Sequence, residues 1–252
     1  MTPSAMVPLA IGLVALLYAS VGHAGATGYI AVMTLFGLEP AVIRPTALVL
    51  NVIVATIASV QFFRAGHFRS GLFWPLVVAS VPCAAAGGAI SLPTKAFETV
   101  VGAVLLASAL RIVRDGRRGG DKTAGAAEPE PRRPIPPAWL ASLGGSIGLL
   151  SGLTGVGGGV FLTPALLALD AAPVKQVAAV SAPFILVNSL AGLAGGLVAG
   201  RAIPTVSLPV VAAAVIGGAV GSQLGAFRLP VQTLRLLMAA VLAVAAIKLL
   251  GL

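Results

Sequence analysis

The sequence predicts an all-α polytopic membrane protein made of two homologous repeats. Each repeat is expected to hold a broken or re-entrant helical pair followed by three transmembrane helices. Three observations carry this prediction. The 252-residue chain is 58% hydrophobic and only 9% charged, whereas about 25% of the residues in soluble domains are charged. Long stretches contain no charged residue, and the same order of elements occurs twice. A broken pair counts as two elements, so each repeat has an odd number of elements. An odd number would invert the second repeat relative to the first, and inversion is therefore predicted.

Charge-free stretches mark the expected membrane segments, because a bilayer core needs about 20 mostly apolar residues per helix. The long stretches are residues 1 to 38, 45 to 63, 70 to 94, 134 to 169, 176 to 200 and 202 to 227. Two shorter apolar runs, 99 to 110 and 236 to 247, are flanked by charged side chains whose long stems can reach the membrane interface. Both are predicted to be helices. No Lys or Arg precedes the first apolar run, so it is interpreted as a retained helix and not a signal peptide.

A hydrophilic segment separates the two halves. Residues 111 to 137 hold seven of the 16 basic residues and four of the seven acids, and they are rich in Gly and Pro. Short basic loops favour the cytoplasm. The chain is therefore divided into a first membrane repeat at 1–113, a cytoplasmic basic linker at 114–137 and a second membrane repeat at 138–252.

The duplication appears as matching residues at a constant spacing. At an offset of 130 residues, glycines and one polar position coincide: Gly22, Gly25, Gly28 and Asn51 fall on Gly152, Gly155, Gly158 and Ser181. Each half then has a turn that contains Pro40 or Pro173. An ordered series of matches favours an internal repeat over chance.

Glycine clusters interrupt the first apolar segment of each half, at 22–28 and 152–159. At 1.5 Å per residue these segments are too long for one crossing of a core about 30 Å thick. Glycine permits unwound backbone, which is tolerated at membrane depth where protein or a water-filled cavity surrounds it. Paired interruptions of this kind point to the substrate site of a transporter, where helix N-termini meet an anion. The alternative is that the small residues only permit close helix packing.

Candidate substrate-binding residues lie in these clusters and in the helix after each proline turn. The clusters offer hydroxyl groups, exposed backbone and one imidazole, and the helices offer amide and hydroxyl groups. The candidates are His23, Gly25, Thr27, Gly28, Asn51, Thr154, Gly155, Gly157, Gly158, Ser181 and Asn188. For the side chains in the helices, an interhelical hydrogen bond is the alternative, and it is favoured for Asn188 and Gln61. His23 either contacts the anion or relays a proton, or it is a structural histidine bonded to an opened carbonyl. Glycines spaced four apart inside uninterrupted helices are expected to serve packing, namely Gly192, Gly196, Gly200, Gly217, Gly221 and Gly225.

Several function classes are disfavoured. All seven acids lie at segment ends or in loops, whereas cation pumps and proton-driven carriers usually need a carboxylate in the membrane. The single cysteine excludes a cysteine cluster for zinc, and GVGGGVFLTP lacks the Gly-Lys-Ser/Thr ending of a nucleotide phosphate loop. We expect no enzyme, no metal, no cofactor and no nucleic-acid partner. An anionic substrate fits better, with Arg44 and Lys175 either near the pore mouth or, as favoured, anchored at the interface.

The stretch GLTGVGGGVFLTPALLAL, followed by the Pro173 turn and a helix with Ser181 and Asn188, resembles the TauE/SafE sulfite exporter family. This family is also called the toluene-sulfonate uptake permease family. The resemblance covers nearly the whole chain. The first cluster departs from the pattern, with a less glycine-rich run from His23 to Tyr29 and with Thr34 where the second half has Pro164.

The resemblance implies a multi-pass protein of the bacterial inner membrane. It implies transport of a small sulfur-containing or organic anion, such as sulfite, sulfoacetate or an aryl sulfonate. We expect the anion to bind between the two glycine-rich breaks near the membrane midplane. A membrane accessory or assembly subunit that transports nothing is the alternative. Which anion is carried, the direction of transport, proton coupling and a homodimeric state remain open.

Overall fold

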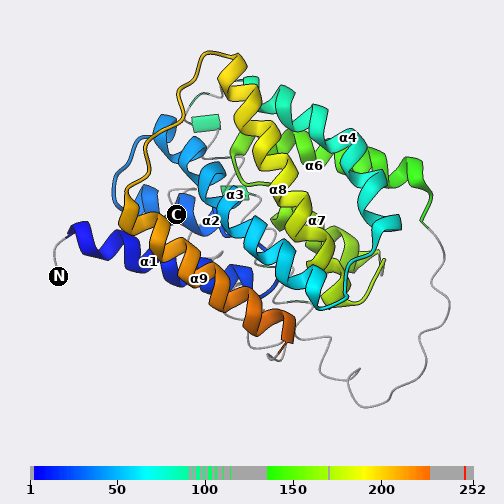
Figure 1. Ribbon diagram of the computed structural model, residues 1–252. Helices are drawn as coiled ribbons and strands as arrows, with labels where there is room; N and C mark the ends of the chain where they lie inside the picture. Colours follow the sequence, from blue (N-terminus) through cyan, green and yellow to red (C-terminus); the bar gives the residue numbers. More distant parts are fainter. Residues whose placement is uncertain are drawn as a thin grey trace.

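The computed structural model describes residues 3–90, 135–169 and 171–227, with a few isolated positions between 93 and 114 and at 247. The described part is all helical, with eight helices and no strand (Figure 1). The helices are α1 (Pro3–Ala19), α2 (Ala26–Leu35), α3 (Pro40–Arg64), α4 (Ser70–Ala89), α6 (Pro137–Thr154), α7 (Gly159–Ala168), α8 (Val174–Val198) and α9 (Leu208–Phe227). Most of the predicted linker and of the predicted helices 99–110 and 236–247 lies outside the described residues.

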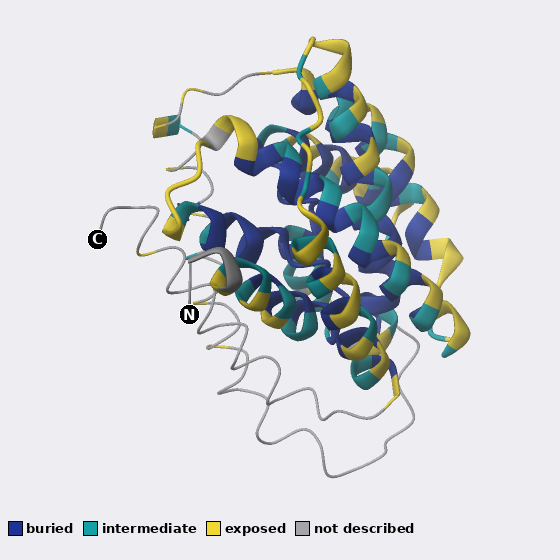
Figure 2. Ribbon diagram, turned by 60° about the vertical axis from the view of Figure 1, so that its left-hand side comes forward, coloured by how far each residue is buried: buried dark blue, intermediate teal, exposed yellow. Residues whose placement is uncertain are grey.

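Four of the described helices, α3, α4, α8 and α9, are long and apolar enough to cross a membrane. A helix of 20 residues reaches about 30 Å, which matches the hydrocarbon core. Buried residues gather inside the bundle, and exposed residues lie on its outside (Figure 2). Large apolar side chains, including Trp74, Val78 and Leu208, are among the exposed ones. An apolar outer surface is what lipid requires, so the all-helical membrane prediction is confirmed at this level.

The described helices of the two halves have the same order and nearly the same lengths. The first half has helices of 17, 10, 25 and 20 residues, and the second half has helices of 18, 10, 25 and 20 residues. Pro40 is the first residue of α3 and Pro173 directly precedes α8. Proline favours a helix start because its missing N–H group needs no partner there. Both predicted proline turns therefore lie where a helix begins.

The helix boundaries correct the register in which the two halves were compared. The start of α2 lies 133 residues before the start of α7, not 130. Gly25 then corresponds to Gly158, since each directly precedes its short helix. The glycines of both clusters recur every third residue, so a shift of three residues keeps most glycine matches. The pairing of Asn51 with Ser181 is wrong in this register, because they are the twelfth residue of α3 and the eighth of α8.

Helices from different halves pack against each other. The contacts join α4 to α6, α1 to α9 and α3 to α8. Glycines of α6 lie against backbone carbonyls of α4, and glycines of α9 lie against those of α1. The pairs are Gly144 with Leu76, Gly148 with Ser80, Gly152 with Ala84, Gly217 with Gly12, Gly221 with Leu16, and Gly225 with Ser20. The packing role expected for the α9 glycines is confirmed. Gly152, predicted to lie in the second break, is instead a packing residue of α6.

The same contacts give the relative directions of the helices. Residue numbers rise together along the α4–α6 and α1–α9 pairs, so each of these pairs is parallel. In the α3–α8 pair, a Cβ atom at Gly192 would contact Leu48, and Asn51 approaches Ser189. Later residues of α3 therefore lie beside earlier residues of α8, so these two helices are antiparallel (Figure 1).

Candidate functional site

Two glycine-rich breaks interrupt the helices near the centre of the described bundle. The first separates α1 from α2, and the second separates α6 from α7. Their glycines have left-handed backbone, with φ of 76° at Gly22, 103° at Gly25, 76° at Gly155, 77° at Gly157 and 85° at Gly158. Side chains are costly in this conformation, which explains why glycine occurs at these positions. The breaks predicted from the sequence are therefore present.

His23 joins the two breaks directly. It lies in the first break with 4% of its surface exposed. Its Nε2 atom is 2.9 Å from the carbonyl oxygen of Gly159, the first residue of α7. Its Nδ1 atom is 3.3 Å from the carbonyl oxygen of Val21. A contact between residues 136 positions apart thus places the two breaks against each other. The imidazole binds a backbone carbonyl, as the structural alternative predicted, and no contact tests its role toward an anion.

Asn51 faces the second break from the middle of α3. The side chain is fully buried, and its Nδ2 atom is 3.4 Å from both the Val156 carbonyl oxygen and the Ser189 hydroxyl. Its Oδ1 atom has no hydrogen-bond partner among the described residues. A Cβ atom added at Gly157 would contact the Asn51 amide and lie 3.1 Å from the Ser189 hydroxyl. The amide therefore sits directly on the glycine backbone.

The short helix α7 begins at this place. Gly158 is its N-cap residue and offers no side chain to cap it. The N–H groups of Phe161 and Leu162 are bonded to the carbonyl oxygen of Gly158. In any helix the first N–H groups have no partner within the helix, and the aligned peptides place partial positive charge there. Val160, in the first turn, is buried. The second break therefore presents a buried positive helix end beside the Asn51 amide.

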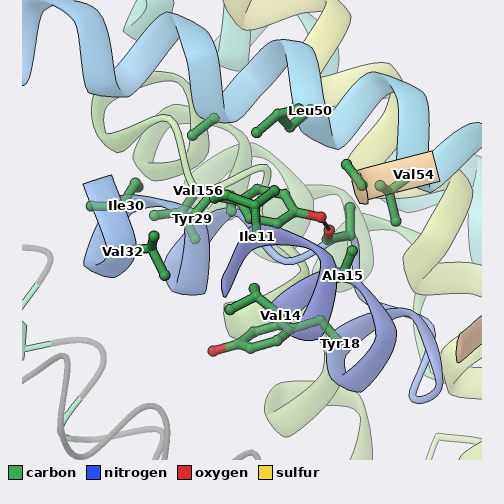
Figure 3. Close-up of a cluster of buried hydrophobic side chains, with 14 of the residues drawn as sticks. Ile11, Val14, Ala15, Tyr18, Tyr29, Ile30, Val32, Leu50, Val54 and Val156 are labelled. Carbon is green, nitrogen blue, oxygen red and sulfur yellow. Dashed lines mark hydrogen bonds between the residues drawn. The ribbon is translucent and has the colours of Figure 1, made fainter. Parts of the chain in front are cut away.

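The first break is filled differently. Thr27 donates a 3.0 Å hydrogen bond to the Tyr18 hydroxyl, and the Tyr29 hydroxyl donates a 2.6 Å bond to the carbonyl oxygen of Ala24. A Cβ atom at Gly25 would lie 2.9 Å from the Tyr29 ring. Gly28 lies inside α2, packed against α1. Both tyrosines belong to a buried apolar cluster that includes residues of both halves (Figure 3). The first break is thus packed by tyrosine side chains.

The remaining predicted site residues form hydrogen bonds within or between helices. Thr154 donates a 2.7 Å bond to Leu150 in its own helix, and Ser181 lies 2.8 Å from the Thr163 hydroxyl. Asn188 donates 3.1 Å to the Ser80 hydroxyl of α4, so its expected interhelical bond is present. Gln61 likewise donates a 3.2 Å bond from α3 to the carbonyl oxygen of Ala219 in α9. A substrate role for Thr154, Ser181 and Asn188 stays a prediction.

Arg44, favoured as an interface anchor, is enclosed by protein, with 8% of its surface exposed. Its guanidinium donates to carbonyl oxygens at the end of α4: 2.8 Å to Gly87, 3.3 Å to Gly88 and 3.0 Å to Ile90. It also donates to the carbonyl of Gly152 in α6. Carbonyls at helix ends lack intrahelical partners and carry partial negative charge, so they can hold a guanidinium. Lys175, by contrast, is exposed.

Comparisons with known proteins agree with this architecture. The family model for the sulfite exporter TauE/SafE matches residues 7–249. The chain belongs to the TauE/SafE sulfite exporter family. It is 38% identical over 196 residues to the "Probable membrane transporter protein y4hK" of Sinorhizobium fredii, an alignment that covers 78% of this chain and 77% of that protein. No solved structure matches the chain. The chain is thus a multi-pass membrane transporter of this family.

Two residues beside the second break were not predicted from the sequence, namely Ser189 and Ile185. Ile185 and Ser189 are four residues apart on α8, so they share one helix face, and both lie where a Cβ atom of Gly157 would be. The period of four was visible in the sequence. The sequence did not show what this helix face contacts, because that depends on how α8 packs against the second break.

Proposed function

We propose that this TauE/SafE transporter carries a small sulfur-containing or organic anion, such as sulfite or an organosulfonate, across the bacterial inner membrane. The anion binds at the second break, against the N-terminus of α7. Asn51 from α3 and His23 from the first break complete the site. The family name supports sulfite as the first substrate to test.

The observation that carries this proposal is the meeting of the two breaks at the start of α7. A left-handed glycine run, a buried helix N-terminus and the buried Asn51 amide lie together there. Helix N-termini bind anions because unpaired N–H groups and the helix dipole both favour negative charge. The Asn51 amide also has two N–H groups, whose 3.4 Å contacts are long for hydrogen bonds. These groups are available to an oxyanion.

The buried charged groups also favour an anion over a cation. The buried residues that the structure describes include the bases His23 and Arg44 but no Asp or Glu. Glu39 is the one acidic residue in the described ranges 3–90, 135–169 and 171–227, and its side chain is exposed. Cation sites in membranes generally need a carboxylate, whereas an anion is repelled by one. The described interior is therefore suited to negative charge.

The proposed architecture is a pair of inverted repeats. Nearly equal helix lengths and the matching pairs α4–α6 and α1–α9 support a duplication. The antiparallel packing of α3 on α8 supports inversion, because these are the corresponding 25-residue helices. In inverted-repeat transporters, broken helices from the two halves meet at the substrate site. The boundary between the repeats is the linker at 114–137.

Transport by the purified protein in liposomes tests the function. Vesicles loaded with unlabelled sulfite should accumulate labelled sulfite, and methanesulfonate added outside should compete. Sodium acetate measures selectivity for the sulfur oxyanion, and empty liposomes give the leak. Failure to move sulfite, sulfonate or carboxylate would refute the proposal. If such a protein copurified with a partner, an accessory role would replace it.

A further inference from the structure

We propose that Arg44 and Arg201 together form a second anion site, at the end of the bundle where α4 and α8 terminate. The site takes the sulfite or sulfonate group of the transported anion before or after it occupies the central site. This inference rests on the proposed function for the identity of the anion. It does not rest on the contacts at the second break.

The two arginines are brought together by the packing of α4 on α8. The carbonyl oxygen of Gly88 accepts a hydrogen bond from Arg44. The same oxygen lies 3.9 Å from the Cβ position of Gly196 on α8. Gly196 in turn accepts a 2.9 Å hydrogen bond from the backbone N–H of Arg201. The C-terminal ends of α4 and α8 meet at the top of the molecule in Figure 1. Arg201 thus follows the end of α8 that lies against the Gly88 carbonyl to which Arg44 is bonded.

The backbone fixes Arg201 at this position. Gly200 follows α8 with φ of 75° and has no atom within 4 Å of its Cβ position. Gly200 was expected to serve helix packing, and that expectation is wrong. It terminates α8 in a left-handed turn, a role for which glycine is favoured. The turn directs the chain so that Arg201 comes directly after the helix end.

The charges of this pair are not balanced by the described residues. The hydrogen bonds of Arg44 all go to backbone carbonyls, which carry no full charge. One terminal nitrogen of Arg201, Nη2, is buried and has no hydrogen-bond partner among the described residues. Two guanidinium groups near each other repel, and a buried N–H group without a partner costs free energy. An oxyanion bound between them removes both penalties.

The chemistry of guanidinium sets the class of ligand. Its planar fork of N–H groups matches two oxygens of one oxyanion, and the resulting hydrogen bonds are charge-assisted. Arg201 is half-buried and therefore reachable from outside the bundle. Arg44 lies near the start of α3, whereas the basic RAGHFR loop follows its end. Short basic loops favour the cytoplasm, so the arginine pair is expected on the opposite side of the membrane.

Ligand-induced thermal stabilisation of the full-length protein in detergent tests the site. Sodium sulfite and sodium methanesulfonate are titrated at constant ionic strength with sodium gluconate. Loss of a charge-assisted contact in Arg201→Gln should raise the half-saturating concentration about tenfold or more. Arg64→Gln is the matched control, because Arg64 is an exposed arginine at the other end of α3. It should titrate like the wild type. Arg201→Lys, which keeps the charge but loses the fork, should fall between them.

Transport kinetics separate this inference from the proposed function. If the site is correct, Arg201→Gln raises KM for sulfite and leaves kcat nearly unchanged. If Arg201→Gln and Arg64→Gln show the same titrations and the same KM as the wild type, the arginine site is refuted while the transport function stands. If the wild type transports no anion but binding still depends on Arg201, the site stands and the transport function falls.

Discussion

Replacement of Gly157 by alanine tests whether the second break must present bare backbone. Gly157 has φ of 77°, and left-handed backbone costs an L-residue about 1–2 kcal/mol. The new methyl group would also contact the Asn51 amide, with Ile185 Cγ2 at 2.9 Å and the Ser189 hydroxyl at 3.1 Å. Displacing side chains in a packed core costs a further 1–3 kcal/mol, roughly. We expect a loss of about 2–5 kcal/mol in the free energy of unfolding and the loss of anion transport.

Gly37 provides the matched control for this experiment. Its φ is 75°, nearly the same as that of Gly157, and nothing lies within 4 Å of its Cβ position. Gly37→Ala therefore carries the backbone cost of about 1–2 kcal/mol without any new contact. Denaturant unfolding in detergent measures both variants, and sulfite uptake is measured at a temperature where both are folded. If Gly157→Ala matches Gly37→Ala in stability and uptake, bare backbone at the break is not required.

Three further predictions concern the site and the packing. His23→Ala removes the hydrogen bond between the breaks and should lower the initial rate of sulfite uptake about tenfold. His23→Gln keeps a donor and should retain part of the wild-type uptake rate. Equal rates in the two variants would argue against a role for this bond. Asn51→Asp places a negative charge beside the start of α7 and should raise KM for sulfite about tenfold or more, because the charge repels the anion and donors are lost. Asn51→Ser is neutral and should raise KM less. A larger KM in Asn51→Ser than in Asn51→Asp would contradict an anion site. Gly221→Ala forces α9 away from the α1 backbone and should lower the free energy of unfolding by about 1–3 kcal/mol. As a control, Gly71→Ala at an exposed helical position should raise the free energy of unfolding by up to about 1 kcal/mol. A Gly221→Ala variant as stable as the wild type would contradict the close α1–α9 packing.

The local features of the fold could be predicted from the sequence. Apolar stretches gave the helices, proline gave the starts of α3 and α8, and glycine clusters gave both breaks. Each of these depends on residues close together in the chain. The alignment of the two breaks was shifted by three residues, because glycines at every third position permit more than one alignment. Only the helix ends distinguish these alignments.

The contacts of the site could not be predicted in the same way. His23 reaches a carbonyl 136 residues away, and Asn51 meets Ser189 across an antiparallel helix pair. Neither contact follows from periodicity, because periodicity assigns a residue to a helix face and not to a partner. Arg44 was interpreted as an interface residue since a lone base near a span end usually reaches water. Its burial depends on free carbonyls at the end of α4, which only the packing of the helices supplies.

The two breaks have different roles in the proposed mechanism, although the halves resemble each other in length and order. In the first break, Tyr18 and Tyr29 pack against the start of α2, and the hydroxyl of Thr27 is bonded to Tyr18. In the second, left-handed glycines leave the backbone beside Asn51 without side chains. An anion near the α7 N-terminus would thus receive its helix dipole from the second half and its polar side chains, His23 and Asn51, from the first. Under the proposed function, relative motion of the two halves would separate these groups, and binding and release of the anion would be coupled to that motion.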